Sequence, residues 1–215
     1  MKYSHLSRVY TKHFLAENQS VVIDGDDFHY LKTVMRLRLG YEFRLFNAED
    51  GEFLVKVSVV NRSSLEVRLE ALLRAPAQEK PLTLTLTLAL AIIKPDRMTE
   101  AIKGAVQLGA TGIIPIISER TQHKKIAKER YDRCIIQAIE QSERFSPTEL
   151  LPEISLPEFL KTNKSQIIVA CESEDSSKKI VNIKKIEDEV VILIGPEGGF
   201  SEAEIEMLKP MDNVH

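Results

Sequence analysis

The sequence has 215 residues, of which 43% are hydrophobic and 28% charged, a composition typical of a globular protein with one large domain or two small ones. No apolar run approaches the roughly 20 residues that a membrane-spanning helix needs, and the first residues lack the apolar stretch of a secretory signal. The two cysteines, Cys134 and Cys171, exclude a disulfide scaffold and a Cys-based zinc site. They predict two buried free thiols in a reducing, cytoplasmic setting.

The net charge of −3 excludes a generally basic surface. Positive charge is concentrated in residues 120–133, which hold six lysines and arginines against two acids. Binding of nucleic acid would therefore require a local patch. The five histidines show no spacing typical of a metal site, so no metal is expected.

Residues 1–74 predict a small β-barrel, because short apolar runs alternate with turn-prone groups. The runs are Val21–Ile23, Glu42–Phe46, Phe53–Val60 and Leu65–Leu69. Between the first two, Phe28, Leu31, Val34 and Met35 fall at helical spacing and predict one short helix before Gly40. Residues 75–81 contain two prolines and predict a linker.

From residue 82 onward strands alternate with helices, which predicts a parallel α/β sheet covered on both faces. We expect strands at Leu82–Ile93, Gly112–Ile117, Gln166–Cys171 and Val190–Ile194. A helix after the first strand should bury Met98, Ile102, Val106 and Leu108 and end at Gly109, and another should span about 127–144.

The turn after the last of these strands is the segment most indicative of a ligand site. Gly195, Gly198 and Gly199 leave backbone amides accessible, and Ser201 with Glu204 forms the capping box of a following helix. Loops at the carboxyl ends of parallel strands bind ligands, so we expect a polar small molecule here. The segment is neither a P-loop nor a dinucleotide fingerprint, and Glu197 would repel phosphate. A purely structural glycine turn is the alternative.

The segment Ile194–Ser201 resembles the signature of the bacterial 16S ribosomal RNA uridine-N3 methyltransferases, a family of the SPOUT superfamily. Other segments agree with that family in order and spacing: Lys94–Met98, Pro115–Arg120, Ala138–Arg144, Arg8–Tyr10 and His29–Leu37. The resemblance covers nearly the whole chain. It implies a PUA-like RNA-binding barrel followed by an α/β methyltransferase domain with a trefoil knot, and a homodimer.

The resemblance also implies the reaction, a methyl transfer from S-adenosylmethionine to N3 of a uridine in the 16S RNA of the small ribosomal subunit. Cofactor contacts are then expected from residues 193–199, namely Leu193, Ile194, Gly195, Pro196, Glu197, Gly198 and Gly199. An arginine can stabilise negative charge that develops on the uracil oxygens, and Arg144 and Arg120 are the candidates. For each, a surface salt bridge is an equally good interpretation.

Basic residues of the barrel are suited to contacts with RNA phosphate. They are Arg8, Lys32, Arg36, Arg38 and Arg44, and Lys124 and Lys125 form a second candidate patch. The alternative is an ordinary solvated surface, since Asp26 and Glu42 are close in sequence.

Two departures from the family pattern stand out. Gly104 and Gln107 replace a lysine and a glutamate, a joint loss that should be nearly neutral if the pair forms a salt bridge in relatives. The family also continues beyond the last helix with a cofactor-binding segment, whereas this sequence stops at His215, so we expect that part of the pocket to be missing from it. A catalytically deficient RNA-binding protein on the same scaffold, or an unrelated α/β small-molecule sensor, would be the alternatives.

Overall fold

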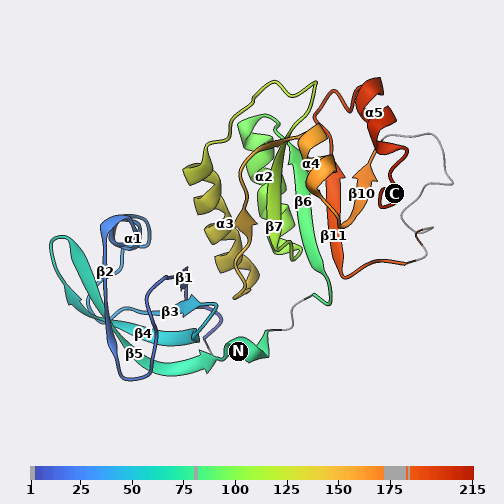
Figure 1. Ribbon diagram of the computed structural model, residues 1–215. Coiled ribbons are helices and arrows are strands. Elements are labelled where there is room, and N and C mark those ends of the chain that lie inside the picture. Colours follow the sequence, from blue (N-terminus) through green and yellow to red (C-terminus); the bar gives the residue numbers. More distant parts are fainter. Residues whose placement is uncertain (1–2, 80–81, 172–182, 184) are drawn as a thin grey trace. The chain divides into compact units, whose positions relative to one another are not determined.

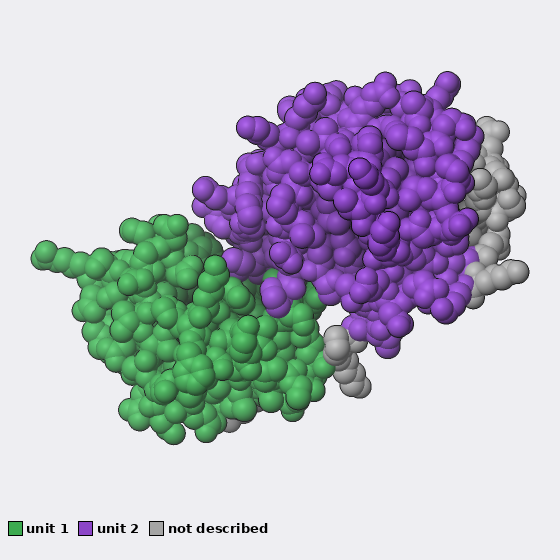
Figure 2. Space-filling model, in the orientation of Figure 1, with its two compact units in different colours: residues 1–80, 139–146 green, residues 81–138, 147–215 purple. Residues whose placement is uncertain are grey.

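A computed structural model describes residues 3–79, 82–171, 183 and 185–215, and the chain divides into two compact units. Unit 1 contains Met1–Lys80 and Ile139–Ser146, and unit 2 contains Pro81–Ala138 and Pro147–His215 (Figures 1 and 2). The sequence-based boundaries of 1–74, 75–81 and 82–215 differ from this division in one important respect. The end of a helix that begins in unit 2 is part of unit 1.

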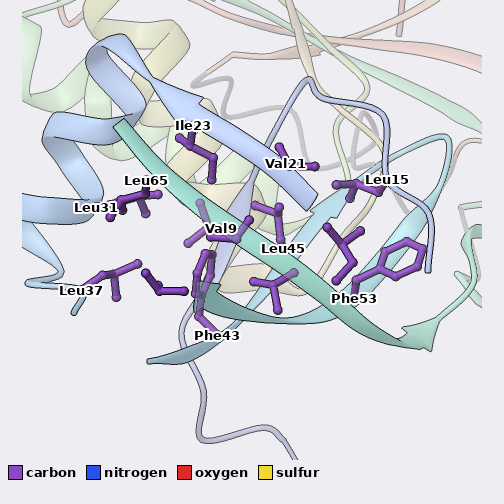
Figure 3. Close-up of a cluster of buried hydrophobic side chains, with 14 of the residues drawn as sticks. Val9, Leu15, Val21, Ile23, Leu31, Leu37, Phe43, Leu45, Phe53 and Leu65 are labelled. Atoms are coloured by element: carbon purple, nitrogen blue, oxygen red, sulfur yellow. The ribbon is translucent and has the colours of Figure 1, made fainter. Parts of the chain in front are cut away.

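Unit 1 is built on a curled sheet of five strands among the described residues, in the order β1-β3-β4-β5-β2. The strands are β1 (Arg8–Tyr10), β2 (Ser20–Asp24), β3 (Glu42–Asn47), β4 (Gly51–Val60) and β5 (Ser64–Arg74). Strand β1 pairs with β3 in parallel, and the other pairs are antiparallel. Inward side chains of all five strands form one hydrophobic core (Figure 3). The expected strands are confirmed.

The expected short helix of unit 1 has two parts. A helix α1 (Gly25–His29) runs directly into a π-helical turn η1 (Tyr30–Val34). Phe28 and Leu31 are buried in the core as expected, but Val34 is 65% exposed. The prediction for Val34 was wrong because the wider π turn rotates it away from the α-helical spacing. A short 3-10 turn η2 (Pro76–Gln78) follows the sheet.

Unit 2 is a parallel sheet in the order β10-β11-β6-β7-β8, with β9 also paired to β7. The strands are β6 (Thr85–Ala91), β7 (Gly112–Ile117), β8 (Glu149–Leu150), β9 (Ile154–Ser155), β10 (Gln166–Ala170) and β11 (Glu189–Ile194). The helices are α2 (Pro95–Gln107), α3 (Lys128–Ser142), α4 (Leu156–Thr162) and α5 (Glu202–Leu208). The predicted alternation of strands and helices is confirmed.

Helices cover both faces of this sheet (Figure 1). Connections between parallel strands are right-handed. Helices α2 and α3 lead from β6 to β7 and from β7 to β8, and so lie on one face of the sheet. Helix α4 leads in the opposite direction, from β9 to β10, and so lies on the other face. Helices α4 and α5 pack against Ala89, Ile116 and Leu193. On α2, Met98, Ile102 and Val106 are fully buried.

Leu108 was also expected on the buried face of α2, but it is 78% exposed. The helix ends at this residue, and Gly109 with φ of +104° then turns the chain away. Gly109 therefore ends the helix as predicted. Leu108 lies at the end of the helix, so the spacing that buries the other three side chains does not bury it.

The last described residues run beside β10. Val214 forms a parallel bridge with Ile167, and the backbone N–H of Ile167 donates to Asn213 O at 2.8 Å. Within the described part of the chain, no helix is both long and apolar enough to cross a membrane.

Candidate active site

Strands β11, β6 and β7 are neighbours, and their carboxyl ends meet at one edge of the sheet of unit 2. After β6 the chain moves through α2 to β7 on one side, while β10 and β11 lie on the other side. The gap between the loops that follow β6 and β11 is thus the point where the strand order reverses. Open parallel sheets bind ligands at such a point.

The loop after β11 is a stiff turn that begins the helix α5. The N–H of Gly199 donates to Pro196 O at 2.8 Å, and Gly199 has a φ of +67°, a conformation that favours glycine. At Gly195, an added Cβ would lie 3.1 to 3.3 Å from the buried ring of Phe200. The conformation of Gly199 and the close packing at Gly195 therefore both favour glycine, and Gly198 and Gly199 are exposed.

Glu204 links this loop to the one after β7. The predicted capping box is confirmed, since Ser201 N–H donates to Glu204 Oε2 at 2.9 Å and Glu204 N–H donates to Ser201 Oγ at 3.2 Å. The second oxygen, Oε1, accepts the N–H of Glu119 at 2.8 Å. Glu204 is only 4% exposed, so both of its bonds are made away from water.

The loop after β7 is itself a closed turn. Ser118 N–H donates to Thr121 Oγ1 at 3.0 Å, the two hydroxyl groups lie 2.8 Å apart, and Thr121 N–H donates to Ser118 O at 3.1 Å. The sequence analysis did not single out Ser118 and Thr121 or the second bond of Glu204. The Ser-x-x-Thr spacing at a strand end could have indicated the turn, whereas the bond from Glu119 to Glu204 links residues 85 positions apart.

Charged side chains surround the β11 loop. Arg120 donates from Nη1 to Gly198 O at 2.6 Å, and Lys94 N–H, after β6, donates to Glu197 Oε1 at 3.4 Å. The pKa of the Glu197 carboxyl is held below its usual value by its own backbone N–H and then by the N–H and charge of Lys94 and the charge of His123. An ionised carboxylate therefore faces this edge of the sheet, which favours a cationic ligand over a phosphate.

The expected cofactor residues differ in how far they are exposed to solvent. Leu193 is fully buried in the core and offers a ligand only its backbone, and Pro196 is also buried. Ile194 is 36% exposed. Glu197, Gly198 and Gly199 are exposed, so these three residues form the accessible part of the loop.

The two candidate catalytic arginines lie in different units. Arg120 is at the sheet edge of unit 2, with its guanidinium on the glycine loop. Arg144 follows α3 in unit 1, where burial lowers the pKa of its guanidinium. Its carbonyl oxygen accepts Nη2 of Arg8 at 2.7 Å.

Two of the expected phosphate contacts, Arg8 and Arg44, are buried. Arg8 Nε and Arg44 Nη1 lie 3.2 and 2.8 Å from the carboxylate of Glu52, which is 3% exposed, and Arg74 Nη2 lies 3.3 Å from the same group. Arg8 also stacks over Phe46, and burial lowers its pKa to about 10. Side chains held in this way do not reach a phosphate, so Arg8 and Arg44 leave the set of RNA-binding candidates.

These arginines also bind the end of α3. Arg8 Nη1 donates to Ile139 O at 2.8 Å, Arg44 Nη1 donates to Glu143 Oε1 at 3.2 Å, and Arg74 Nη2 donates to Glu143 O. Carbonyls in the last turn of a helix lack partners within the helix. The arginine cluster provides them and so fixes residues 139–146 in unit 1.

The remaining basic candidates are exposed. Lys32, Arg36 and Arg38 lie in and just after η1 in unit 1, and Lys124 and Lys125 precede α3 in unit 2. Among the described residues, no group of His, Cys, Asp and Glu could hold a metal ion. Cys134 is buried as expected, but Cys171, at the end of β10, is exposed.

Comparison with protein-family profiles assigns both parts of the chain. A profile described as an RNA methyltransferase domain matches residues 78–214, and one described as an RNA methyltransferase PUA domain matches residues 23–70. The ribosomal RNA small subunit methyltransferase E of Rickettsia conorii is 39% identical over 216 residues, which cover 99% of this chain and 86% of that protein. The chain belongs to this methyltransferase E family.

Solved structures of methyltransferases agree with the assignment. A methyltransferase of Legionella pneumophila in complex with the bound cofactor SAM has a TM-score of 0.83 and 28% identity, covering 95% of this chain and 86% of that one. The methyltransferase E of Neisseria gonorrhoeae bound to S-adenosyl methionine has a TM-score of 0.79 and 28% identity, covering 94% and 84%. Unit 2 thus has the SPOUT fold, and unit 1 is PUA-like.

Proposed function

We propose that the protein transfers the methyl group of S-adenosylmethionine to N3 of a uridine in the 16S RNA of the small ribosomal subunit. The observation that carries this proposal is the exposed glycine loop after β11, which lies where the strand order of unit 2 reverses. Hydrogen bonds of Glu204 connect this loop to the loop after β7. Membership of the methyltransferase E family supports the reaction class. We further propose that it acts in the cytoplasm as a homodimer.

The residues of the glycine loop fit this cofactor. Exposed Gly198 and Gly199 would let the cofactor approach the backbone, and the negative charge of Glu197 on this loop suits a ligand that carries a positive sulfonium. S-adenosylmethionine, when bound, supplies an activated methyl group. Gly195, Pro196 and Phe200 fix the shape of the loop, and Arg120 holds it through the carbonyl of Gly198.

The uracil must lose its N3 proton, and the negative charge then spreads over its two carbonyl oxygens. A guanidinium placed beside these oxygens stabilises the charge more strongly in a dry site than in water. We assign this role to Arg120 or Arg144. The guanidinium of Arg120 has five N–H groups, and one on Nη1 donates to Gly198 O. The base must also be unpaired or flipped out for N3 to be reached.

Lysine and arginine side chains of the protein should hold the RNA backbone. We assign this role to the exposed Lys32, Arg36 and Arg38 of unit 1 and to Lys124 and Lys125 of unit 2. Contacts of this kind position RNA without reading its sequence.

The reaction is tested with ribosomal small subunits, and separately with their naked RNA, prepared without base methylation and supplied with isotope-labelled S-adenosylmethionine. We expect label in 16S RNA and 3-methyluridine as the modified nucleoside in mass spectrometry. Label in another nucleoside would contradict the N3 assignment, and absence of label on both substrates would contradict the enzyme. Light scattering of the purified chain tests the homodimer.

The role of the loop is tested by charge reversal at an exposed position. Glu197→Lys should raise the KM for S-adenosylmethionine by roughly tenfold or more while folding is retained, because it gives the loop the same sign of charge as the cofactor's sulfonium. Glu187→Lys, on the exposed segment before β11, is the matched control and should leave that KM unchanged. Equal KM values for the two variants would remove Glu197 from the cofactor site.

A further inference from the structure

Arg36 has a backbone conformation that L-residues rarely adopt. Met35 N–H donates to Tyr30 O at 3.2 Å and Leu37 N–H donates to Leu31 O at 3.1 Å, while Arg36 between them has a φ of +55°. The two hydrogen bonds close the wide π turn η1, and a residue in the left-handed conformation just after a helix is usually glycine. A side chain there crowds the next carbonyl oxygen, so arginine strains the turn.

The hydrophobic core holds this turn in place. Leu31 and Leu37, the two residues joined by the helix-ending hydrogen bond, are 0% and 4% exposed and lie within the core of unit 1 (Figure 3). Because both are anchored, the turn cannot relax by rotating. Arg36 itself is exposed, so the strained turn directs its side chain to solvent.

Arg36 has two exposed cationic neighbours in the sequence, and the Nζ of one of them, Lys32, lies 4.9 Å from the centre of the Phe28 ring. Lys32 and Arg38 are exposed on either side, and none of the three takes part in an ion pair with the described residues. Of the acids close in sequence, Asp24 ends β2, and Asp26 and Asp27 lie in the first turn of α1, at the opposite end of the helical segment. Glu42 begins β3, where it pairs with Lys56 at 3.9 Å.

Two exposed apolar residues neighbour these cations in the sequence, Val34 between Lys32 and Arg36 and Leu39 directly after Arg38. Val34 is 65% exposed and Leu39 is 70% exposed. A protein surface of exposed cations without ion pairs and of accessible apolar groups suits an RNA segment with unstacked bases, where the cations meet phosphate and the apolar groups meet base faces. Arg8 and Arg44 offer the contrast, because Glu52 neutralises them inside the unit.

We propose that Arg36 is a phosphate-binding residue for ribosomal RNA and that its strained position is retained because binding needs the side chain there. Glycine would suit the turn better and leave the site without its cation. The inference deepens the proposed function and rests on it, since it takes ribosomal RNA as the partner of unit 1.

The test compares Arg36→Gly with Arg36→Lys and Asn18→Gly in the full chain, with an unmodified 16S RNA transcript as the probe. Asn18 is also exposed in unit 1 and has a φ of +62°, so its change to glycine is a matched control for the backbone. Thermal midpoints and RNA dissociation constants at several salt concentrations are measured for all variants.

We expect Arg36→Gly to keep or raise the thermal midpoint and to weaken RNA binding about tenfold. The slope of log affinity against log salt should fall in magnitude by about one, the loss of one phosphate contact. Arg36→Lys should retain most of the affinity, and Asn18→Gly should bind as the original protein does.

Three results would overturn the inference: equal RNA affinity of Arg36→Gly and the original protein, a thermal midpoint lowered by several degrees in Arg36→Gly, or no RNA binding by the original protein. The methyl-transfer assay separates its failure from that of the proposed function. If the original protein methylates ribosomal RNA and Arg36→Gly binds equally well, only the role of Arg36 is contradicted.

Discussion

Two buried glutamates organise the two units in different ways. Glu52 in unit 1 is 3% exposed and accepts from the guanidinium groups of Arg8 and Arg44, with Arg74 3.3 Å away. Glu204 in unit 2 is 4% exposed and accepts from backbone N–H groups of Ser201 and Glu119. The first carboxylate is one part of a charge network, and the second is held by neutral donors.

The difference has consequences for what each group can do. Removing the charge of Glu52 leaves several cations in a buried site, which is costly because buried charge needs a partner. Removing the charge of Glu204 leaves only backbone donors, whose unmet hydrogen bonds cost less. Because backbone N–H groups and not charged side chains hold Glu204, the charges of Glu197 and Arg120 remain at the exposed surface of the candidate site.

The largest expected effect is at Glu52. Glu52→Gln should lower the free energy of unfolding by about 3 to 5 kcal/mol, because Arg8, Arg44 and Arg74 lose their shared counter-charge in a buried site. Urea unfolding measures this. The control is Glu42→Gln, which breaks an exposed pair of 3.9 Å with Lys56 and should cost no more than about 1 kcal/mol. Similar losses for both would show that the cluster in unit 1 tolerates unpaired cations.

A smaller effect is expected at Glu204. Glu204→Gln keeps one oxygen but turns an NH2 group toward a backbone N–H, so the free energy of unfolding should fall by about 1 to 3 kcal/mol. The loops after β7 and β11 should separate, and the KM for S-adenosylmethionine should rise more than kcat falls. Glu202→Gln, an exposed position in the same first turn, should change neither. A stability loss without a change in KM would leave Glu204 with a structural role alone.

The smallest effect is expected at Glu140, a carboxylate of unit 1 that accepts the N–H of Tyr10 at 3.0 Å. Burial raises its pKa above 4.5, against the opposing hydrogen bond and the charge of Arg8. The folded state therefore binds the proton more tightly than the unfolded state does. This stabilisation is complete below the unfolded pKa and is lost as pH rises through the folded pKa.

Glu140→Gln should thus make the protein modestly more stable than the original at pH 7 to 8, because the buried carboxylate is removed while an acceptor for Tyr10 N–H remains. The advantage should shrink as pH falls toward 4, where the original side chain is protonated. Urea unfolding across this range checks the trend. A difference that is independent of pH would show that burial of Glu140 is not what the substitution relieves.

Local patterns in the sequence predicted much of the fold and part of the site. The alternation of strands and helices and the capping box of Ser201 and Glu204 both depend on neighbours in the chain or on repeating side-chain spacing. Each was found where expected. The preference for glycine at Gly195 and Gly199 is of the same kind, since it concerns the shape of one turn.

The features that were missed depend on contacts between distant residues. In sequence, Arg8 and Arg44 are unpaired cations, and only the register that places Glu52 opposite Phe46 brings a carboxylate to them. Arg8 reaches Ile139 O across 131 positions. No spacing rule connects such residues, so a basic cluster that is neutralised in the interior cannot be told apart from one that faces RNA. The exposure of Val34 was missed for another reason, because a π turn changes the helical period.

Helix α3 has a consequence for how this protein can be cut and recombined. Its residues up to Ala138 belong to unit 2, and from Ile139 the same helix belongs to unit 1. A gene fragment that stops at residue 80 would therefore encode a barrel without Ile139, Glu143 and Arg144. The carbonyl oxygens of these residues accept hydrogen bonds from the guanidinium groups of Arg8 and Arg74. Exchange of barrels between relatives would have to carry the eight residues 139–146 along with the N-terminal part, as two inserts from one parent.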